Sequence, residues 1–317
     1  MRMKPTSGCN LTVLQDMSGS RSPVLLMAER GLAFAGDTQQ EYTMSTRISS
    51  PILTTSDFDA VLFDLDGVIT DTAALHIAAW KELFDHYLKA RATHEQVHFH
   101  SFDPETNYLQ YVDGKARDDG ITSFLASRGI ALPYGSPEDA PEQETICGLG
   151  NKKNRIFQAL LQTQGITVFA SSVAFIHQLR ARGLHTAIVS SSRNCAAVLA
   201  KAGLTALFDV RIDGVESQRL ALPGKPAPDM FLEAVRRLGV EPARAMVVED
   251  SIAGVHAART GQFGLVIGVA RADHRAALRA HGADVVVADL GEITLNDSGT
   301  TGSSKTTIAP SVVVRKE

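Results

Sequence analysis

Two aspartates one residue apart, Asp64 and Asp66, are the first side chains in this sequence that could carry out chemistry together. They directly follow a run of apolar residues in the stretch AVLFDLDG, which begins at residue 60. A carboxylate can act as a nucleophile, as a general acid or base, or as a ligand of a hard metal ion. An Asp-x-Asp motif at the end of a strand is often only turn chemistry, so its assignment depends on what lies nearby.

Polar groups also follow other apolar runs in the chain. The stretch SSSRN (190–194) follows the run HTAIV, Glu249 and Asp250 end the run AMVVED, and the stretch GKPAPD places Lys225 before a helix. Ligands of a parallel sheet bind beyond the carboxyl ends of its strands, so we expect these groups to meet at one edge. Taken singly, the serines and the acidic pair would be ordinary helix caps and the lysine solvated; their joint occurrence favours a site.

Four carboxylates at one edge of a sheet would repel one another unless a cation joined them. Carboxylate oxygens suit Mg²⁺, which also tends to keep a substrate phosphate among its ligands. The sequence therefore predicts a Mg²⁺ site. Ser190, Lys225 and the backbone amides after Ser190 could hold the other phosphoryl oxygens, and one carboxylate would remain as a nucleophile that forms an aspartyl phosphate.

Short β-branched runs alternate with helical segments in the middle of the chain, and this alternation predicts the fold. The runs have the composition of strands buried on both faces, as in a parallel sheet. We expect an α/β fold, a doubly wound parallel sheet with a helical cap inserted after the first strand. The expected strands are 60–64, 185–191, 245–250, 264–270 and 283–289, and the expected helix ends are Gly183, Gly203, Gly239 and Gly261.

The same patterns divide the chain. Residues 74–165 contain helical stretches without a convincing strand and are expected to form the cap, and residues 57–73 and 166–290 the α/β catalytic core. Residues 1–56 lack a sustained period and are expected to be a poorly ordered N-terminal extension. Residues 291–317 are expected to be a flexible C-terminal tail, in which SVVVRK could add a short edge strand.

Composition excludes several classes of function. With 44% hydrophobic and 21% charged residues and a net charge of −4, the 317-residue chain has no field suited to nucleic acid or an anionic membrane. Its three cysteines have neither disulfide nor zinc spacing. No apolar run approaches the roughly 20 residues of a membrane span, and the apolar stretch near the start is too short for a signal peptide. These features predict a cytoplasmic monomer that binds neither nucleic acid nor membrane.

The order of the motifs resembles the haloacid dehalogenase superfamily of phosphotransferases, and most closely its β-phosphoglucomutase branch. The likeness spans residues 57 to about 290 and rests on DLDGVITDT, GKPAPD and VVEDSIAG. It implies that Asp64 is the nucleophile and Asp66 the general acid or base. The other core roles that it implies are phosphate binding by Ser190 and Lys225, and Mg²⁺ binding by Asp64, the Asp66 carbonyl, Glu249 and Asp250.

The resemblance also extends to the cap. DTAALHIAAWK looks like the hinge and first cap helix of the mutases, in which Thr72 and His76 position the acid/base aspartate and Trp80 faces the sugar. VDGKARDD resembles the cap loop, with Gly114 in it and Arg117 at the phosphate that is not being transferred. The remaining substrate contacts that it implies are Lys153 in the cap and Ser191, Ser192, Arg193 and Asn194 in the core loop.

Some positions depart from the family pattern. Lys115 and Ala116 replace a small residue and a serine of the cap loop, and Arg193 stands where lysine is common, which changes the geometry of the cation. The stretch that begins at residue 131 is longer and more polar than the usual cap. Without the resemblance, Trp80 would be read as cap packing and Arg117 as a surface residue.

Three functions are compatible with these residues. The predicted one is a Mg²⁺-dependent sugar-phosphate mutase that interconverts β-glucose 1-phosphate and glucose 6-phosphate through an aspartyl-phosphate enzyme and glucose 1,6-bisphosphate. The alternative is a sugar-phosphate phosphatase, in which water resolves the same intermediate. A non-catalytic regulatory or partner protein is the third, and the presence of Asp64 argues against it.

Overall fold

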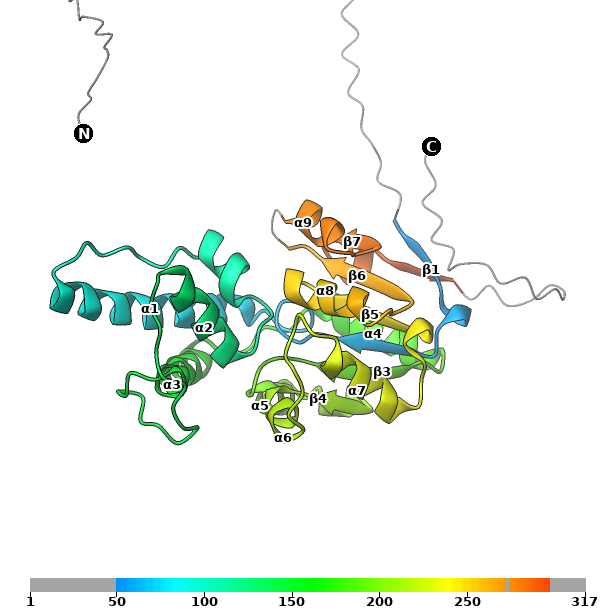
Figure 1. Ribbon diagram of the computed structural model, residues 1–317. Helices are drawn as coiled ribbons and strands as arrows, with labels where there is room; N and C mark the ends of the chain where they lie inside the picture. The colour runs from blue at the N-terminus through cyan, green and yellow to red at the C-terminus, as the bar shows by residue number, and fades with distance from the viewer. Residues whose placement is uncertain (1–49, 272–273, 297–317) are drawn as a thin grey trace, which may run out of the picture. The chain divides into compact units, whose positions relative to one another are not determined.

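Six strands form one parallel sheet in the computed structural model, which describes residues 50–271 and 274–296 (Figure 1). They are β2 (Ala60–Phe63), β3 (His185–Val189), β4 (Val210–Ile212), β5 (Ala245–Glu249), β6 (Leu265–Val269) and β7 (Val285–Val287). The spatial order is β4-β3-β2-β5-β6-β7. Ala60 of β2 is paired with His185 on one side and with Ala245 on the other. The three strands whose ends carry the predicted chemistry are therefore direct neighbours.

Helices cover both faces of this sheet, which explains why β2, β5 and β6 are buried along their whole length. α4 (Ala170–Ala181) and α5 (Cys195–Lys201) pack on one face. α7 (Asp229–Leu238), α8 (Ile252–Thr260) and α9 (Arg275–Ala280) pack on the other. This arrangement confirms the predicted doubly wound α/β class.

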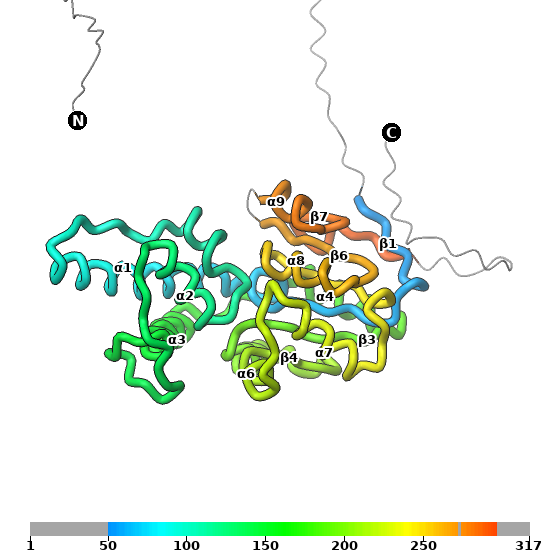
Figure 2. Tube along the Cα trace, viewed as in Figure 1, coloured from blue at the N-terminus to red at the C-terminus, as the bar shows by residue number. Residues whose placement is uncertain are grey.

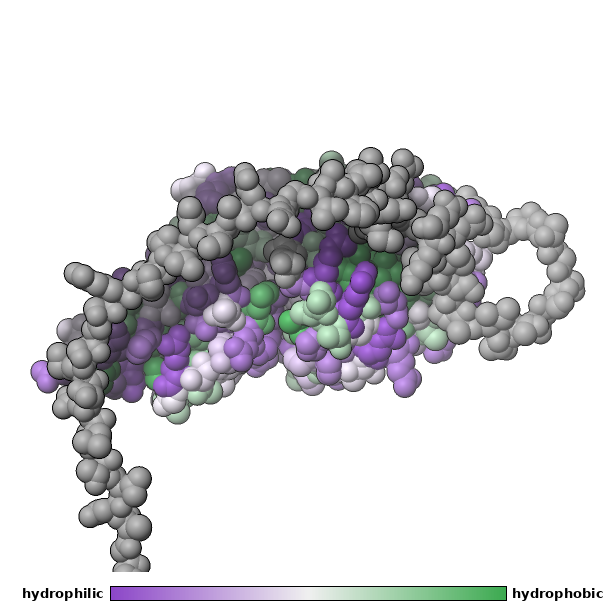
Figure 3. Space-filling model, turned by 90° about the horizontal axis from the view of Figure 1, so that it is seen from above, coloured by the Kyte–Doolittle hydropathy of each residue, from purple (hydrophilic) through white to green (hydrophobic). Residues whose placement is uncertain are grey.

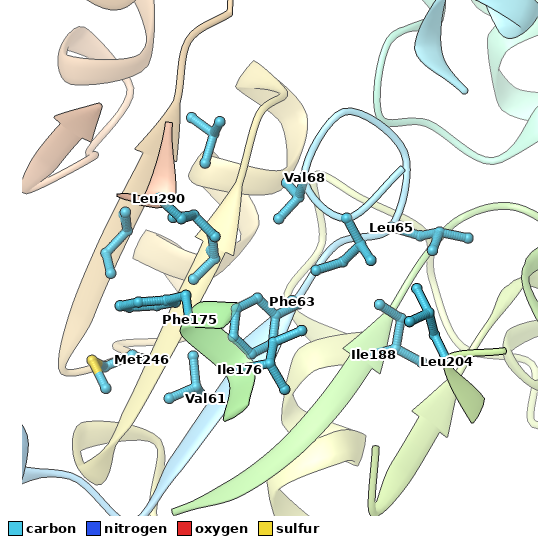
Figure 4. Packing of buried hydrophobic residues seen from close by; sticks show 14 of the residues in the cluster. Val61, Phe63, Leu65, Val68, Phe175, Ile176, Ile188, Leu204, Met246 and Leu290 are labelled. Carbon is cyan, nitrogen blue, oxygen red and sulfur yellow. The ribbon is translucent and has the colours of Figure 1, made fainter. Parts of the chain in front are cut away.

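The loop that follows β2 is held in place by buried apolar side chains on either side of its two aspartates. Phe63, Leu65 and Val68 are all fully buried, and Figure 4 shows them packed together with Phe175 and Ile176 of α4. The rings of Phe63 and Phe175 meet edge to face, with centroids 6.5 Å apart. Because apolar and acidic residues alternate here, burying one set fixes the direction of the other.

The cap is a separate layer of helices with its own aromatic core. Its elements are α1 (Ala73–Glu95), a π-helical turn (Tyr108–Val112), α2 (Arg117–Ser127) and α3 (Ile146–Gln164). Phe84 of α1 lies at the centre of that core, 5.2 Å from the rings of Trp80 and Phe102 and 4.1 Å from that of Phe124. Figure 2 traces the chain as it leaves β2 for the cap and returns to α4.

The structure adds strands that the sequence did not predict. β4 has only three residues, with Arg211 in the middle, and so has no apolar run to reveal it. β1 (Ile52–Thr54) and β8 (Thr294–Asn296) form a two-stranded parallel sheet, so regular structure extends into the segments assigned to the N-terminal extension and the C-terminal tail. The rest of those segments, with SVVVRK, lies outside the described residues.

Three of the four glycines that predicted helix ends, at 183, 203 and 239, have positive φ, whereas Gly261 does not and Gln262 takes the left-handed conformation instead. The remaining helical segments are α6 (Gly214–Arg219) and four single 3₁₀ turns, Thr55–Asp57, Thr205–Leu207, Pro242–Arg244 and Leu290–Glu292. Across the two described ranges, no helix combines the length and the apolar character needed to cross a membrane. Figure 3 shows hydrophilic and hydrophobic residues interspersed on the face seen from above.

Candidate active site

One pocket is lined both by the cap and by the loops at the carboxyl ends of the central strands. Most of the predicted site residues line it, namely Asp64, Asp66, His76, Trp80, Gly114, Arg117, Lys153, Ser190, Ser191, Ser192, Arg193, Asn194 and Asp250. Thr72, Lys225 and Glu249 are buried and are not among its lining residues. The structure therefore brings the predicted residues together, with three of them behind the wall of the pocket.

The cap loop is in direct contact with the core. Ser191 Oγ donates a hydrogen bond of 2.8 Å to the carbonyl of Gly114, and Asn194 Nδ2 donates one of 2.9 Å to Asn154 Oδ1. Gly114 has a φ of 70°, and a Cβ there would overlap the side chain of Ser251. Glycine is therefore required for this approach of the cap to the core, and Ser191 serves that contact in this structure.

A buried lysine ties the predicted nucleophile to two neighbouring strands. Lys225 Nζ donates to Asp64 Oδ1 (2.6 Å), to the Val189 carbonyl (3.1 Å) and to Glu249 Oε1. Burial raises the pKa of Asp64 to about 8, against the opposing effect of Lys225. All three N–H donors of an ammonium group are then in use, so Lys225 would have to exchange one of these bonds to hold a phosphate as the resemblance implies.

Glu249 differs most from its predicted role. Its Oε2 accepts hydrogen bonds from the backbone amides of Asp250 and Ser251, both 3.1 Å, and from Ser251 Oγ, 2.9 Å, while Oε1 accepts from Lys225. The side chain has no exposed surface. Three protein donors thus occupy Oε2, Lys225 binds Oε1, and Glu249 anchors Lys225 in this structure, so a direct bond from Glu249 to a metal would require Oε1.

Asp64 and Asp250 are the predicted metal-binding carboxylates that line the pocket. The Asp250 carboxylate occupies the space beside Gly67, whose φ of 82° and missing Cβ make room for it. Burial, with Asp113 and Asp64, raises the pKa of Asp250 well above its usual value. No group of three or more His, Cys, Asp or Glu side chains in the described part of the chain is arranged as a metal site. Asp64, Asp250 and the Asp66 carbonyl nevertheless fit Mg²⁺, which needs few carboxylates and keeps water and phosphate oxygens.

Asp66 is held by groups from the hinge and the cap. Thr72 Oγ1 donates to Asp66 Oδ1, and His76 Nε2 lies 3.4 Å from the same oxygen. Lys153 Nζ lies 2.6 Å from His76 Nδ1. When Lys153 is protonated it can only donate to Nδ1, which puts the imidazole proton on Nε2, facing Asp66. Burial pushes the pKa of Asp66 up, but His76, Thr72 and Lys153 outweigh it and hold that pKa below its usual value.

Lys153 and Trp80 are buried in the cap as well as lining the pocket. Lys153 is 4% exposed, and burial lowers its pKa to about 7. Its ammonium lies over the Trp80 ring, 4.8 Å from the centroid, and Trp80 itself stacks on Phe84. Both side chains line the pocket, and both also hold the cap together.

The serine loop after β3 is largely satisfied internally. The amide of Ser192 donates to Ser190 Oγ (3.1 Å) and the amide of Asn194 to Ser192 Oγ (3.2 Å). The backbone amides after Ser190 were predicted to hold phosphoryl oxygens, and two of them, those of Ser192 and Asn194, orient hydroxyls here. Because Ser190 Oγ accepts one bond, its own O–H is available to a ligand in the pocket.

A pair of arginines forms a second basic group on the wall of the pocket. Arg117 is the first residue of α2 in the cap, and Arg193 comes from the core loop after β3. Both guanidinium groups lie within 3.6 Å of the Asp118 carboxylate. Burial lowers the pKa of Arg117, and the charge of Arg193 adds to that effect. Two planar guanidinium groups, each able to form bidentate hydrogen bonds, are suited to bind a phosphate.

Sequence reasoning missed several pocket residues. Asp113, Tyr108 and Asn154 line the pocket, and Ser251 contacts the cap loop beside it. Burial raises the pKa of Asp113 to about 7, with a further contribution from Glu249. Asp113 and Asn154 stand inside the motifs VDGKARDD and NKKN, so position within a motif was the available signal; Tyr108 had none.

Comparison with known proteins identifies the family of this chain. The family model described as haloacid dehalogenase-like hydrolase matches residues 58–261. The β-phosphoglucomutase of Mycobacterium tuberculosis is 50% identical over 237 residues, which cover 74% of this chain and 90% of that protein. The β-phosphoglucomutase of Bacillus subtilis is 31% identical over 238 residues, 74% and 92% of the two chains.

Among solved structures, a β-phosphoglucomutase from Clostridium difficile has a TM-score of 0.56 at 23% identity and covers 74% of this chain and 92% of its own. This likeness supports the fold of core and cap. The family match spans more than half of the chain. Together with the two relatives it shows the family as well as the fold. The chain therefore belongs to the haloacid dehalogenase-like hydrolases, in the branch that contains the β-phosphoglucomutases.

Proposed function

We propose that this protein is a Mg²⁺-dependent β-phosphoglucomutase that interconverts β-glucose 1-phosphate and glucose 6-phosphate through glucose 1,6-bisphosphate. The observation that carries the proposal is a single pocket with two phosphate-binding groups, Asp64 with Ser190 at one and Arg117 with Arg193 at the other. Identity to the M. tuberculosis β-phosphoglucomutase supports the choice of sugar. A monomeric state and a cytoplasmic location belong to the same proposal.

Asp64 would attack the phosphorus atom from the end of β2. Lys225 offsets the charge of the carboxylate before attack, and the Ser190 hydroxyl can donate to a phosphoryl oxygen. Mg²⁺ held by Asp64, Asp250 and the Asp66 carbonyl would supply further positive charge at the transferred group. The result of attack is an aspartyl phosphate on Asp64.

Asp66 would move the proton between enzyme and sugar. Its lowered pKa keeps the carboxylate ionised, so it can accept the proton of a sugar hydroxyl that attacks the aspartyl phosphate, and return it in the reverse step. Thr72 and His76 hold its Oδ1 in position. His76 lies on the first cap helix, and the cap contact at Gly114 helps to exclude water from the intermediate.

A mutase and a phosphatase differ in what the rest of the pocket must do. In a mutase the bisphosphate presents first one and then the other phosphate to Asp64, so a second group must hold the phosphate that is not reacting. A phosphatase needs only the first group. Because the family also contains hydrolases, hydrolysis of a sugar phosphate is the alternative, and the arginine pair favours the mutase.

Substitutions of the two aspartates of the motif should impair different steps of the reaction. Asp64→Asn should abolish the phosphoenzyme, because a neutral amide is not a nucleophile. Asp66→Asn should still be phosphorylated by a reactive donor but lose roughly 10²- to 10⁴-fold in turnover, the usual contribution of a general acid or base. Rapid quenching and intact-mass detection of the phosphoenzyme distinguish them, and a phosphoenzyme in Asp64→Asn would show that the nucleophile is misassigned.

The metal assignment predicts a selective effect at Asp250. EDTA should abolish turnover and added Mg²⁺ restore it. Asp250→Asn should raise the Mg²⁺ concentration needed for half-maximal activity by more than the roughly 10- to 100-fold typical of outer-shell partners, while the control Asp57→Asn, at an exposed site, should match the wild type. Full turnover in EDTA would disprove the metal requirement.

The arginine pair predicts a split between two activities. Arg117→Ala should reduce mutase turnover roughly 10- to 100-fold, because charged hydrogen bonds to the non-reacting phosphate are lost. Hydrolysis of acetyl phosphate, which has a single phosphate, should change little. Arg155→Ala, in the same cap with its side chain 66% exposed, is the control. Equal loss of both activities in Arg117→Ala would mean that Arg117 is structural.

A further inference from the structure

A carboxylate lies between the two arginines of the second phosphate-binding group. Asp118 Oδ1 is 3.6 Å from Arg117 Nε, and Asp118 Oδ2 is 3.5 Å from Arg193 Nη2. The Tyr134 hydroxyl donates to Oδ2 at 3.2 Å. Tyr134 belongs to the polar stretch that begins at residue 131, so this stretch reaches the arginine pair through Asp118.

Asp118 compensates the charge of the arginines without occupying them as hydrogen-bond donors. Both ion pairs are longer than the roughly 2.7–2.9 Å of charge-assisted hydrogen bonds. Within the described residues, Arg117 Nε and Asp118 Oδ1 are buried and have no hydrogen-bond partner. The Asp118 side chain is 13% exposed, so water screens it little, and its charge acts strongly on the guanidinium groups.

The net charge of this group decides how tightly it holds a phosphate. Two guanidinium groups and one carboxylate leave one positive charge, against the two that the arginines alone would present. A phosphate monoester carries about −1.5 to −2 at neutral pH. A mutase must release the bound phosphate as well as grip it, because the bisphosphate has to turn round between the two halves of the reaction.

We propose that Asp118 limits the affinity of the Arg117–Arg193 pair for phosphate, so that the bisphosphate can leave and rebind in the opposite orientation. This inference rests on the proposed function and deepens it. Asp118 acts through the arginines and needs no contact with the sugar. Its carboxylate lowers the affinity of the arginine pair for phosphate. A residue that merely anchored the arginines would raise that affinity.

The test is the affinity for glucose 1,6-bisphosphate, measured by calorimetry in the Asp64→Asn background, where no phosphoryl transfer occurs. Asp118→Asn should bind the bisphosphate at least roughly tenfold more tightly, and in the Asp64 enzyme the same change should lower kcat and KM together. Asp118→Ser, a second variant without the charge, should also bind the bisphosphate more tightly than the protein with Asp118. Asp118→Glu, which keeps the charge, should stay close to the wild type.

Asp119→Asn is the matched control, since Asp119 shares the first turn of α2 with Asp118, is exposed and forms no ion pair with the arginines within the described residues. Unchanged or weaker bisphosphate binding in both Asp118→Asn and Asp118→Ser would overturn the inference and make Asp118 an anchor of the arginines. The binding assay needs no turnover. If the wild type fails to isomerise glucose phosphates while Asp118→Asn still binds more tightly, the proposed function fails and the limit on affinity stands.

Discussion

The buried ammonium group of Lys225 is the interaction on which the geometry of the site depends. It bonds Asp64 at the end of β2, Val189 at the end of β3 and Glu249 at the end of β5, and so joins three adjacent strands at one point. Removing one partner of a buried ion pair typically costs about 3–5 kcal/mol. The sheet order therefore has to bring these three ends together before any chemistry can begin, and the anchored loop around Leu65 and Val68 then directs Asp64 toward the pocket.

Charge is distributed unevenly over the pocket. At the sheet end, the carboxylates of Asp64, Asp250 and Glu249 outnumber the single cation Lys225, which is why a metal ion fits there. At the second group, two arginines outnumber Asp118. A ligand with a phosphate at each end and an apolar or hydroxylated body between them matches such a pocket better than a ligand with one phosphate. The cap contacts the core beside the pocket at Gly114 and Asn194.

The core of the site could be predicted from sequence because its residues come directly after apolar runs, and parallel strands bring the loops at their carboxyl ends to one edge of the sheet. Other features depend on contacts between distant segments. The hydrogen bonds of Glu249 come from Lys225 and from the turn at Ser251, and neither partner is visible in the ED motif. The contact between Tyr134 and Asp118 depends on the path of a polar stretch without periodicity. β1 and β8 pair across almost the whole described chain, and neither has a pattern of its own.

The central claim, that one pocket binds two phosphates in order to isomerise a sugar phosphate, is tested most directly by phosphorus NMR. The purified protein is mixed with Mg²⁺, β-glucose 1-phosphate and a trace of glucose 1,6-bisphosphate. The signal of glucose 1-phosphate should be replaced by that of glucose 6-phosphate while the bisphosphate stays at its trace level and little inorganic phosphate appears. Release of inorganic phosphate faster than formation of glucose 6-phosphate would contradict the claim and identify a phosphatase.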